Sequence, residues 1–165
     1  MRSAGYTLIE LLVVISIIGI LSVVAFVNIK DFSSAQDLKK AVGEVQTYLR
    51  LAQSNASSST LCNGVGGVSW NVIFNADSTI QINCGPTNYL IKTLTLQTGI
   101  AIKSPIKTNC DLTLPVTIVY SALKGVPTIP GSTCWTGVDV TITLDNGKGK
   151  TKSLILTSGG AINVQ

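Results

Sequence analysis

The spacing of hydrophobic positions changes along the chain, and each change indicates a different predicted element. The nineteen residues from Leu11 to Ile29 carry no charge, and a helix of that length spans about 28 Å, close to one hydrocarbon core. From Leu38 to Ala56 an apolar residue recurs every three or four positions, which predicts an amphipathic continuation of the helix. Because no proline occurs before Pro86, we expect one helix from about Tyr6 to about Asn55.

After residue 60 apolar residues recur at every second position, and the composition shifts to Val, Ile, Thr and Gly. Alternation of apolar and polar residues predicts strands at Ile80–Cys84, Val116–Tyr120 and Val138–Leu144. The turn sequence at 145–147 predicts a hairpin leading into a strand from Ser153 to Thr157. The pattern therefore predicts an α+β protein, in which a long N-terminal helix packs on a C-terminal antiparallel β-sheet or sandwich.

The composition limits the chemistry that this chain can perform. Apolar residues make up 45% of the chain and charged residues 12%, and histidine is absent, which excludes Ser-His, Cys-His and His-ligated metal sites. We find no catalytic constellation and predict a non-enzymatic protein with no catalytic residue, no metal and no cofactor. The formal net charge of +4 is too small to predict nucleic-acid binding by itself.

The residues before the apolar run include one cation, Arg2, and one carboxylate, Glu10. A carboxylate inside the start of a membrane helix costs about 2.5–3.5 kcal/mol, so Glu10 either lies in the headgroup zone or has a partner. A cleaved secretory signal is disfavoured, because its apolar region is roughly 7–15 residues long and no Ala-x-Ala site follows Ile29. Arg2 favours a cytoplasmic N-terminus, which places the β region outside the cytoplasm.

The stretch from Gly5 to Glu10, Gly-Tyr-Thr-Leu-Ile-Glu, resembles the processing motif of the type IV pilin and type II secretion pseudopilin superfamily. The resemblance implies that prepilin peptidase removes residues 1–5 after Gly5 and that Tyr6 becomes the N-methylated terminus. In a filament, Glu10 of one subunit would then form a salt bridge with the Tyr6 ammonium of its neighbour. The implied partners are other pilin or pseudopilin subunits, the peptidase and the inner-membrane assembly platform.

The resemblance also implies a location and a domain organisation. Before assembly the protein would cross the inner membrane once, with its β domain outside the cytoplasm, and it would afterwards join a pilus or pseudopilus. The expected segments are the leader 1–5, the transmembrane and assembly half of the helix 6–29, its amphipathic half 30–56, and the β domain 61–165.

Gly19 lies inside the transmembrane half of the helix. Glycine costs about 1 kcal/mol in a helix interior, which makes Gly19 the candidate for local unwinding on assembly. The alternative is that Gly19, with Ser16 and Ser22, lets neighbouring helices approach closely in lipid.

The end of the helix resembles the minor pseudopilin H and FimT-like group of minor pilins. The matching residues are Leu49–Ala56, Leu61-Cys62, Trp70, Phe74–Asp77 and the closing segment Ser153–Val164. Gln53 stands where that group carries its second arginine. The resemblance implies a structural filament subunit, and a DNA-binding FimT-like minor pilin for natural transformation is the alternative.

Three lysines follow the predicted hairpin turn at alternate positions, Lys148, Lys150 and Lys152. As a row on one strand face they would contact nucleic-acid phosphates. The alternative is a solvated hairpin whose lysines block edge pairing. The residues 160–163, Gly-Ala-Ile-Asn, lack both arginines that DNA-binding members carry near their C-terminus.

The four cysteines, Cys62, Cys84, Cys110 and Cys134, lie in the region placed outside the cytoplasm. An even number there predicts two disulfide bonds. Three pairings are possible, and we favour Cys62–Cys84 and Cys110–Cys134 because each closes a loop of about 22–24 residues, worth roughly 3 kcal/mol. A zinc site is disfavoured, because the chain has no Cys-x-x-Cys and no histidine.

Overall fold

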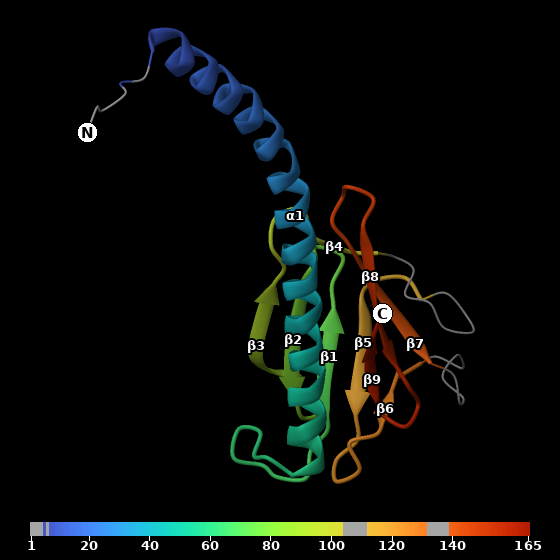
Figure 1. Cartoon of the computed structure of the whole chain (residues 1–165). Coiled ribbons are helices and arrows are strands. Elements are labelled where there is room, and N and C mark those ends of the chain that lie inside the picture. The colour runs from blue at the N-terminus through green and yellow to red at the C-terminus, as the bar shows by residue number, and fades with distance from the viewer. Residues whose placement is uncertain (1–4, 6, 104–111, 132–138) are drawn as a thin grey trace. The chain divides into compact units, whose positions relative to one another are not determined.

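The computed structural model describes residues 5, 7–103, 112–131 and 139–165, without the side chains of residues 23–31. The chain divides into two compact units, residues 1–36 and 37–165. A single helix, α1 (Leu8–Ser57), begins in the first unit and ends in the second (Figure 1). The described strands are β1 (Trp70–Phe74), β2 (Thr79–Cys84), β3 (Tyr89–Thr95), β4 (Ala101–Ile102), β5 (Val116–Tyr120), β6 (Pro127–Thr128), β7 (Val140–Asp145), β8 (Thr151–Leu156) and β9 (Ile162–Val164).

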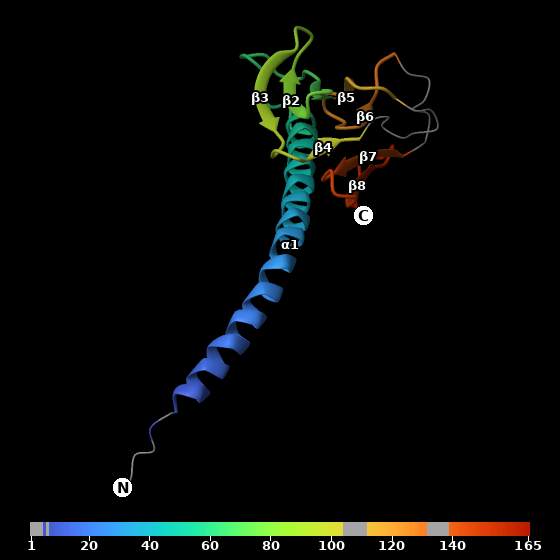
Figure 2. The same ribbon diagram turned by 90° about the horizontal axis from the view of Figure 1, so that it is seen from above.

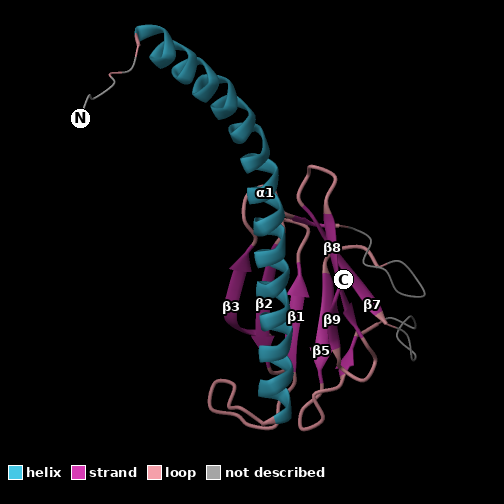
Figure 3. Ribbon diagram, viewed as in Figure 1, coloured by secondary structure: helices cyan, strands magenta, loops and turns pink. Residues whose placement is uncertain are grey.

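The described strands form two antiparallel sheets (Figure 3). One sheet has the order β3-β2-β1-β5-β6 and the other has the order β4-β7-β8-β9. At the centre of the first sheet, Trp70 lies opposite Cys84 of β2 and opposite Tyr120 of β5. A long helix followed by antiparallel sheets confirms the predicted α+β class and is consistent with a pilin fold.

The core of the second unit is built around one apolar stripe of α1. Its members are at most 2% exposed, as their spacing predicts: Leu38, Val42, Val45, Leu49, Ala52 and Ala56. Strands of both sheets lie beside the C-terminal part of α1 (Figure 2). Their buried faces contribute to the same core, in which Val72, Ile118 and Ile142 are fully buried. Burying a side chain of this size contributes roughly 1.5–3 kcal/mol, which fixes the register of each strand.

The helix ends within the polar stretch 54–60. The N–H of Ser58 still donates to the carbonyl of Ser54 (2.9 Å), and the N–H of Thr60 donates to the carbonyl of Asn55 (3.0 Å). Ser59 has a φ of 52°, a left-handed conformation that is typical of the residue terminating a helix. The chain then turns towards β1 through the loop that contains Cys62.

A disulfide bond joins Cys62 to Cys84, with a Cα–Cα distance of 5.9 Å. It ties the loop after α1 to the last residue of β2, where Cys84 is fully buried. This is one of the two pairs favoured on sequence grounds. The other pair, Cys110 and Cys134, lies outside the described residues.

Within the described part of the chain, no helix is both long enough and apolar enough to cross a membrane. The predicted membrane segment runs from Leu11 to Ile29, and the structure does not describe its side chains from residue 23 onward. The membrane span therefore stays a prediction.

Candidate functional site

The first turn of α1 is closed by hydrogen bonds between Thr7 and Glu10. The N–H and the hydroxyl of Thr7 both donate to Oε2 of Glu10, at 3.0 and 2.9 Å, and the N–H of Glu10 donates to Oγ1 of Thr7 at 3.3 Å. Threonine before a helix with glutamate three residues later is a capping box, which satisfies backbone donors that the helix leaves unpaired. This role of Glu10 was not predicted, although the Thr-x-x-Glu pattern in the sequence signals it.

The predicted cleavage site adjoins this cap. Gly5 is exposed, and apart from its two chain neighbours no described heavy atom lies within 4 Å of the position that a Cβ would take. Tyr6, the predicted methylated terminus, lies outside the described residues, and the predicted Tyr6–Glu10 salt bridge joins two subunits. Cleavage, methylation and the salt bridge therefore stay predictions.

The first unit presents apolar side chains on every side of α1. The large ones between Leu8 and Leu21 are 50–82% exposed. A helix that is apolar all round is stable when it is buried in lipid or among other helices. This stretch of α1 therefore needs surroundings that lie outside its own chain.

The helix is continuous through Gly19, and outside the chain neighbours and the backbone of α1 no described heavy atom lies within 4 Å of the position that a Cβ would take there. The hydroxyl of Ser16 donates to the carbonyl of Leu12, and that of Ser22 donates to the carbonyl of Ile18, both at 2.8 Å. Both serines thus satisfy their hydroxyls within the helix. Unwinding on assembly and close helix approach remain the two predictions for this position.

Gln53 connects the C-terminal part of α1 to two loops. Its Nε2 donates to the carbonyl of Gly160, between β8 and β9, at 3.1 Å and to the carbonyl of Gly125, between β5 and β6, at 3.4 Å. Where the FimT-like group carries an arginine, this chain therefore has an amide that holds a loop adjoining each sheet against the helix.

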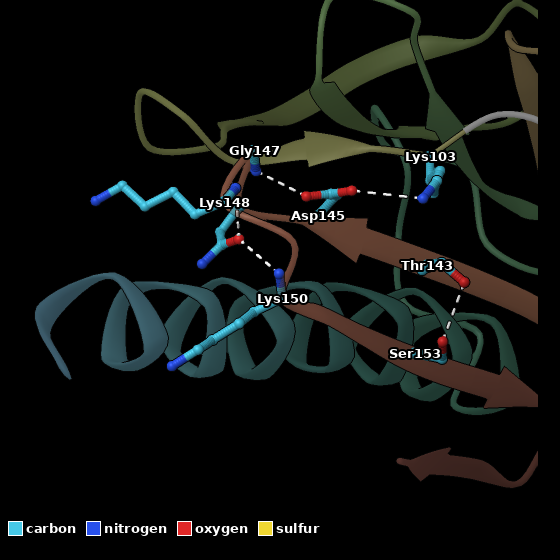
Figure 4. A network of polar contacts seen from close by, with 8 residues as sticks. Lys103, Thr143, Asp145, Gly147, Lys148, Lys150 and Ser153 are labelled. Carbon is cyan, nitrogen blue, oxygen red and sulfur yellow. Dashed lines mark hydrogen bonds and ion pairs between the residues drawn. The ribbon is translucent and has the colours of Figure 1, made fainter. Parts of the chain in front are cut away.

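The lysine-bearing turn between β7 and β8 is held by side chains of its own first residues (Figure 4). Oδ1 of Asn146 accepts the N–H groups of Lys148 (3.0 Å) and Lys150 (3.1 Å). Oδ1 of Asp145 accepts the N–H of Gly147 (2.7 Å). These bonds fix the backbone from which both lysine side chains extend.

The three lysines do not form a row on one strand face, which was one of the two arrangements expected for them. β8 begins at Thr151, so that Lys152 lies on the strand, whereas Lys148 and Lys150 lie in the turn. The turn takes up the residues 146–150, because Asn146 bonds to backbone groups within it. Alternate spacing places side chains on one face only inside a strand.

A cavity of about 600 Å³ opens on the five-stranded sheet, and Asn71 and Thr117 are among the residues that line it. Asn71 is 6% exposed, and its Nδ2 donates to Oδ1 of Asn88 at 2.6 Å. The described residues that line the cavity include no charged side chain. They therefore offer no carboxylate, ammonium or imidazole for acid–base chemistry.

Residues 1–26 match the family model for the prokaryotic N-terminal methylation motif. No curated protein and no solved structure matches the chain. The motif supports a type IV pilin-like family, whose members are structural rather than enzymatic. It indicates a membrane-anchored, pilin-like or pseudopilin substrate of prepilin peptidase.

Proposed function

We propose that this protein is a structural subunit of a type IV pilus or of a type II secretion-like filament. The observation that carries the proposal is the methylation motif at residues 1–26, followed directly by the exposed apolar stretch of α1. In this proposal prepilin peptidase cleaves after Gly5, and the subunit waits in the inner membrane with its β domain outside the cytoplasm. The assembly platform then packs the apolar helices of many subunits together, which buries the exposed side chains.

The carboxylate of Glu10 can take part in the cap and in assembly at the same time. All three capping contacts of Glu10 use Oε2 or its backbone N–H, and Oε1 has no partner among the described residues. In the proposed filament, Oε1 meets the Tyr6 ammonium of the neighbouring subunit. The ion pair neutralises two charges that neither subunit can bury alone, and it sets the axial register of packing.

Within this class we place the chain with the minor pseudopilin H and FimT-like group. The support is the resemblance of Leu49–Ala56 and of the closing segment Ser153–Val164. The first segment contains Gln53 and the last three residues of the buried stripe, and the second contains most of β8 and all of β9. Both segments meet where Gln53 bonds Gly160, so the resembling residues form one connected part of the fold.

The test compares Glu10→Val with Glu10→Gln in cells that also express a wild-type copy. Glutamine retains the capping-box contact but removes the charge, whereas valine removes both. If assembly needs the charge, both variants are inserted, cleaved after Gly5 and one methyl heavier, and both enter filaments at least about tenfold less than wild type, because a buried ammonium left unpaired costs several kcal/mol. Mass spectrometry of membranes and of sheared filaments measures each step.

The two variants separate the roles of Glu10. Normal assembly of Glu10→Gln beside poor assembly of Glu10→Val would assign Glu10 to the helix cap alone. Normal assembly of both would refute the electrostatic register. An uncleaved chain that still begins at Met1 in filaments would contradict the proposed cleavage after Gly5, and absence of the wild-type chain from filaments would contradict the proposed function itself.

A further inference from the structure

Four lysines gather at one end of the second unit. We name them the lysine patch: Lys39 on α1, Lys148 and Lys150 in the turn, and Lys152 on β8. Lys39 and Lys152 line one hollow of about 250 Å³, which brings the helix and the hairpin together. None of the four makes an ion pair with a described residue.

The patch lies at the end of the unit where α1 enters it. Lys39 shares its hollow with Lys152, near the start of β8, whereas Gln53, farther along α1, bonds Gly160 beyond the end of β8. The helix and β8 therefore run the same way, and the turn before Lys152 lies beside the first residues of the unit, which begins at Asp37. Figure 1 shows the β7–β8 turn at this end.

The acidic side chains Asp37, Glu44 and Asp145 do not neutralise the patch. Glu44 is paired with Lys40 at 3.9 Å. Because successive helical residues are about 100° apart, Asp37 and Glu44 both lie about 140–160° around α1 from Lys39. The carboxylate of Asp145 accepts a hydrogen bond from the N–H of Gly147 and forms an ion pair with Lys103 at 3.5 Å.

The turn presents its two lysines in one direction. The side chains of Lys148 and Lys150 extend the same way from the turn in Figure 4, and both residues are exposed. Their backbone is fixed by Asn146, so that binding an anionic surface there requires little ordering of the loop.

The occupant of such a patch must carry several separated negative charges on the side from which α1 enters. The predicted membrane segment ends at Ile29, ten residues before Lys39 in the sequence. Phosphate-bearing headgroups of that membrane have the required charge and lie within reach of the same chain. We propose that the lysine patch docks the second unit onto anionic phospholipid headgroups before assembly. This inference rests on the proposed membrane anchoring.

The electrostatic gain sets the size of the expected effect. A lysine near an anionic membrane surface contributes about fivefold in affinity, and the contribution decays within a Debye length. Docking therefore depends on salt, because that length falls from about 10 Å at 0.1 M to about 3 Å at 1 M. Docking is lost when the subunit leaves the membrane for a filament.

The experiment uses the full chain reconstituted in vesicles of phosphatidylcholine, alone or mixed with phosphatidylglycerol. A water-soluble acetylating ester modifies the lysines, and mass spectrometry gives the rate at each position. We expect Lys148 and Lys150 to react about fivefold more slowly in the anionic vesicles at about 0.1 M salt and equally fast in both at about 1 M. Lys124 is the internal control, because it is exposed and follows Leu123, whose N–H bonds the carbonyl of Ala56 at the other end of the unit.

A triple variant tests whether the patch acts as one surface. As a member of the patch, Lys39 is also expected to be acetylated more slowly in the anionic vesicles. Replacing Lys148, Lys150 and Lys152 by glutamine is expected to abolish this slowing at Lys39, whereas the matched Lys124→Gln variant retains it. Equal rates in both vesicles at low salt would overturn the proposal. So would protection by duplex DNA, or by inorganic phosphate, without protection by anionic vesicles. Vesicle flotation and cleavage by prepilin peptidase do not depend on the patch, so they report separately on the proposed function.

Discussion

Replacing Gly160 by alanine tests how tightly Gln53 holds the β8–β9 loop. Gly160 has a φ of +87°, and an added Cβ would lie 2.5 Å from Nε2 of Gln53 and 3.5 Å from Cδ of Pro127. The left-handed backbone costs an alanine about 1–2 kcal/mol. Moving Gln53 away loses its bond to the carbonyl of Gly160, worth about 1 kcal/mol. We therefore expect Gly160→Ala to lower the free energy of unfolding by about 2–3 kcal/mol.

A matched glycine separates the two costs. Gly149 has a similar φ of +79°, but apart from its two chain neighbours no described heavy atom lies within 4 Å of the position of a Cβ. Gly149→Ala should therefore cost only the backbone strain, about 1–2 kcal/mol. A double-mutant cycle isolates the contact further, because Gly160→Ala made in a Gln53→Ala background no longer displaces an amide.

The assay is urea unfolding of the full chain in micelles, monitored by tryptophan fluorescence, since Trp70 is 3% exposed in the folded protein. We expect a coupling energy of about 1 kcal/mol between Gln53 and Gly160, with unchanged urea dependence. If the two substitutions add within about 0.3 kcal/mol, Gln53 does not anchor the loop and the reasoning is refuted.

Two further predictions concern single ionisable side chains. Burial raises the pKa of Tyr120, whose hydroxyl has no hydrogen-bond partner among the described residues. The folded state therefore favours the neutral phenol, and stability falls as the pH rises above about 10. Tyr120→Phe should abolish this alkaline loss and leave the free energy of unfolding at pH 7 equal or up to about 1 kcal/mol higher, as measured by urea unfolding. A lower value at pH 7 would show that the hydroxyl is paired. Hydrogen bonds from the hydroxyl and N–H of Thr79 hold the pKa of Asp77 below its usual value of 3.8. Its contribution to stability is thus complete above the unfolded pKa and lost as the pH falls through the lower folded pKa. Thr79→Val should raise the pKa of Asp77 in a carboxyl NMR titration, and an unchanged value would contradict this assignment.

Periodicity in the sequence predicted those elements that have one buried face. The helix was expected from about Tyr6 to about Asn55 and is observed at Leu8–Ser57, with its ends set by caps rather than by period. β5 and β7 alternate between buried and less buried residues, so the sequence patterns at Val116–Tyr120 and Val138–Leu144 predicted strands. β3 was not predicted, because it lies at a sheet edge and its residues are exposed almost throughout.

The candidate sites also differ in whether their residues are adjacent in the sequence or are brought together only by the fold. The processing motif is contiguous and matches the family model, so sequence was sufficient to find it. The two-loop contact of Gln53 joins residues more than seventy positions apart, and no local pattern signals it. The three lysines do not form a row because the turn between β7 and β8 is longer than a two-residue hairpin turn. The closeness of Lys39 to Lys152 was not predictable either, since it depends on how α1 packs against β8.

The capping box has a consequence for the timing of maturation. Each of its three hydrogen bonds joins Thr7 to Glu10, and both residues remain after the proposed cut behind Gly5. Excision of the leader therefore leaves these three hydrogen bonds of the first turn of α1 in place. In the proposed mature chain, the first turn of α1 keeps its capping box. The helix therefore does not have to re-form after cleavage, whether the peptidase acts before or after membrane insertion.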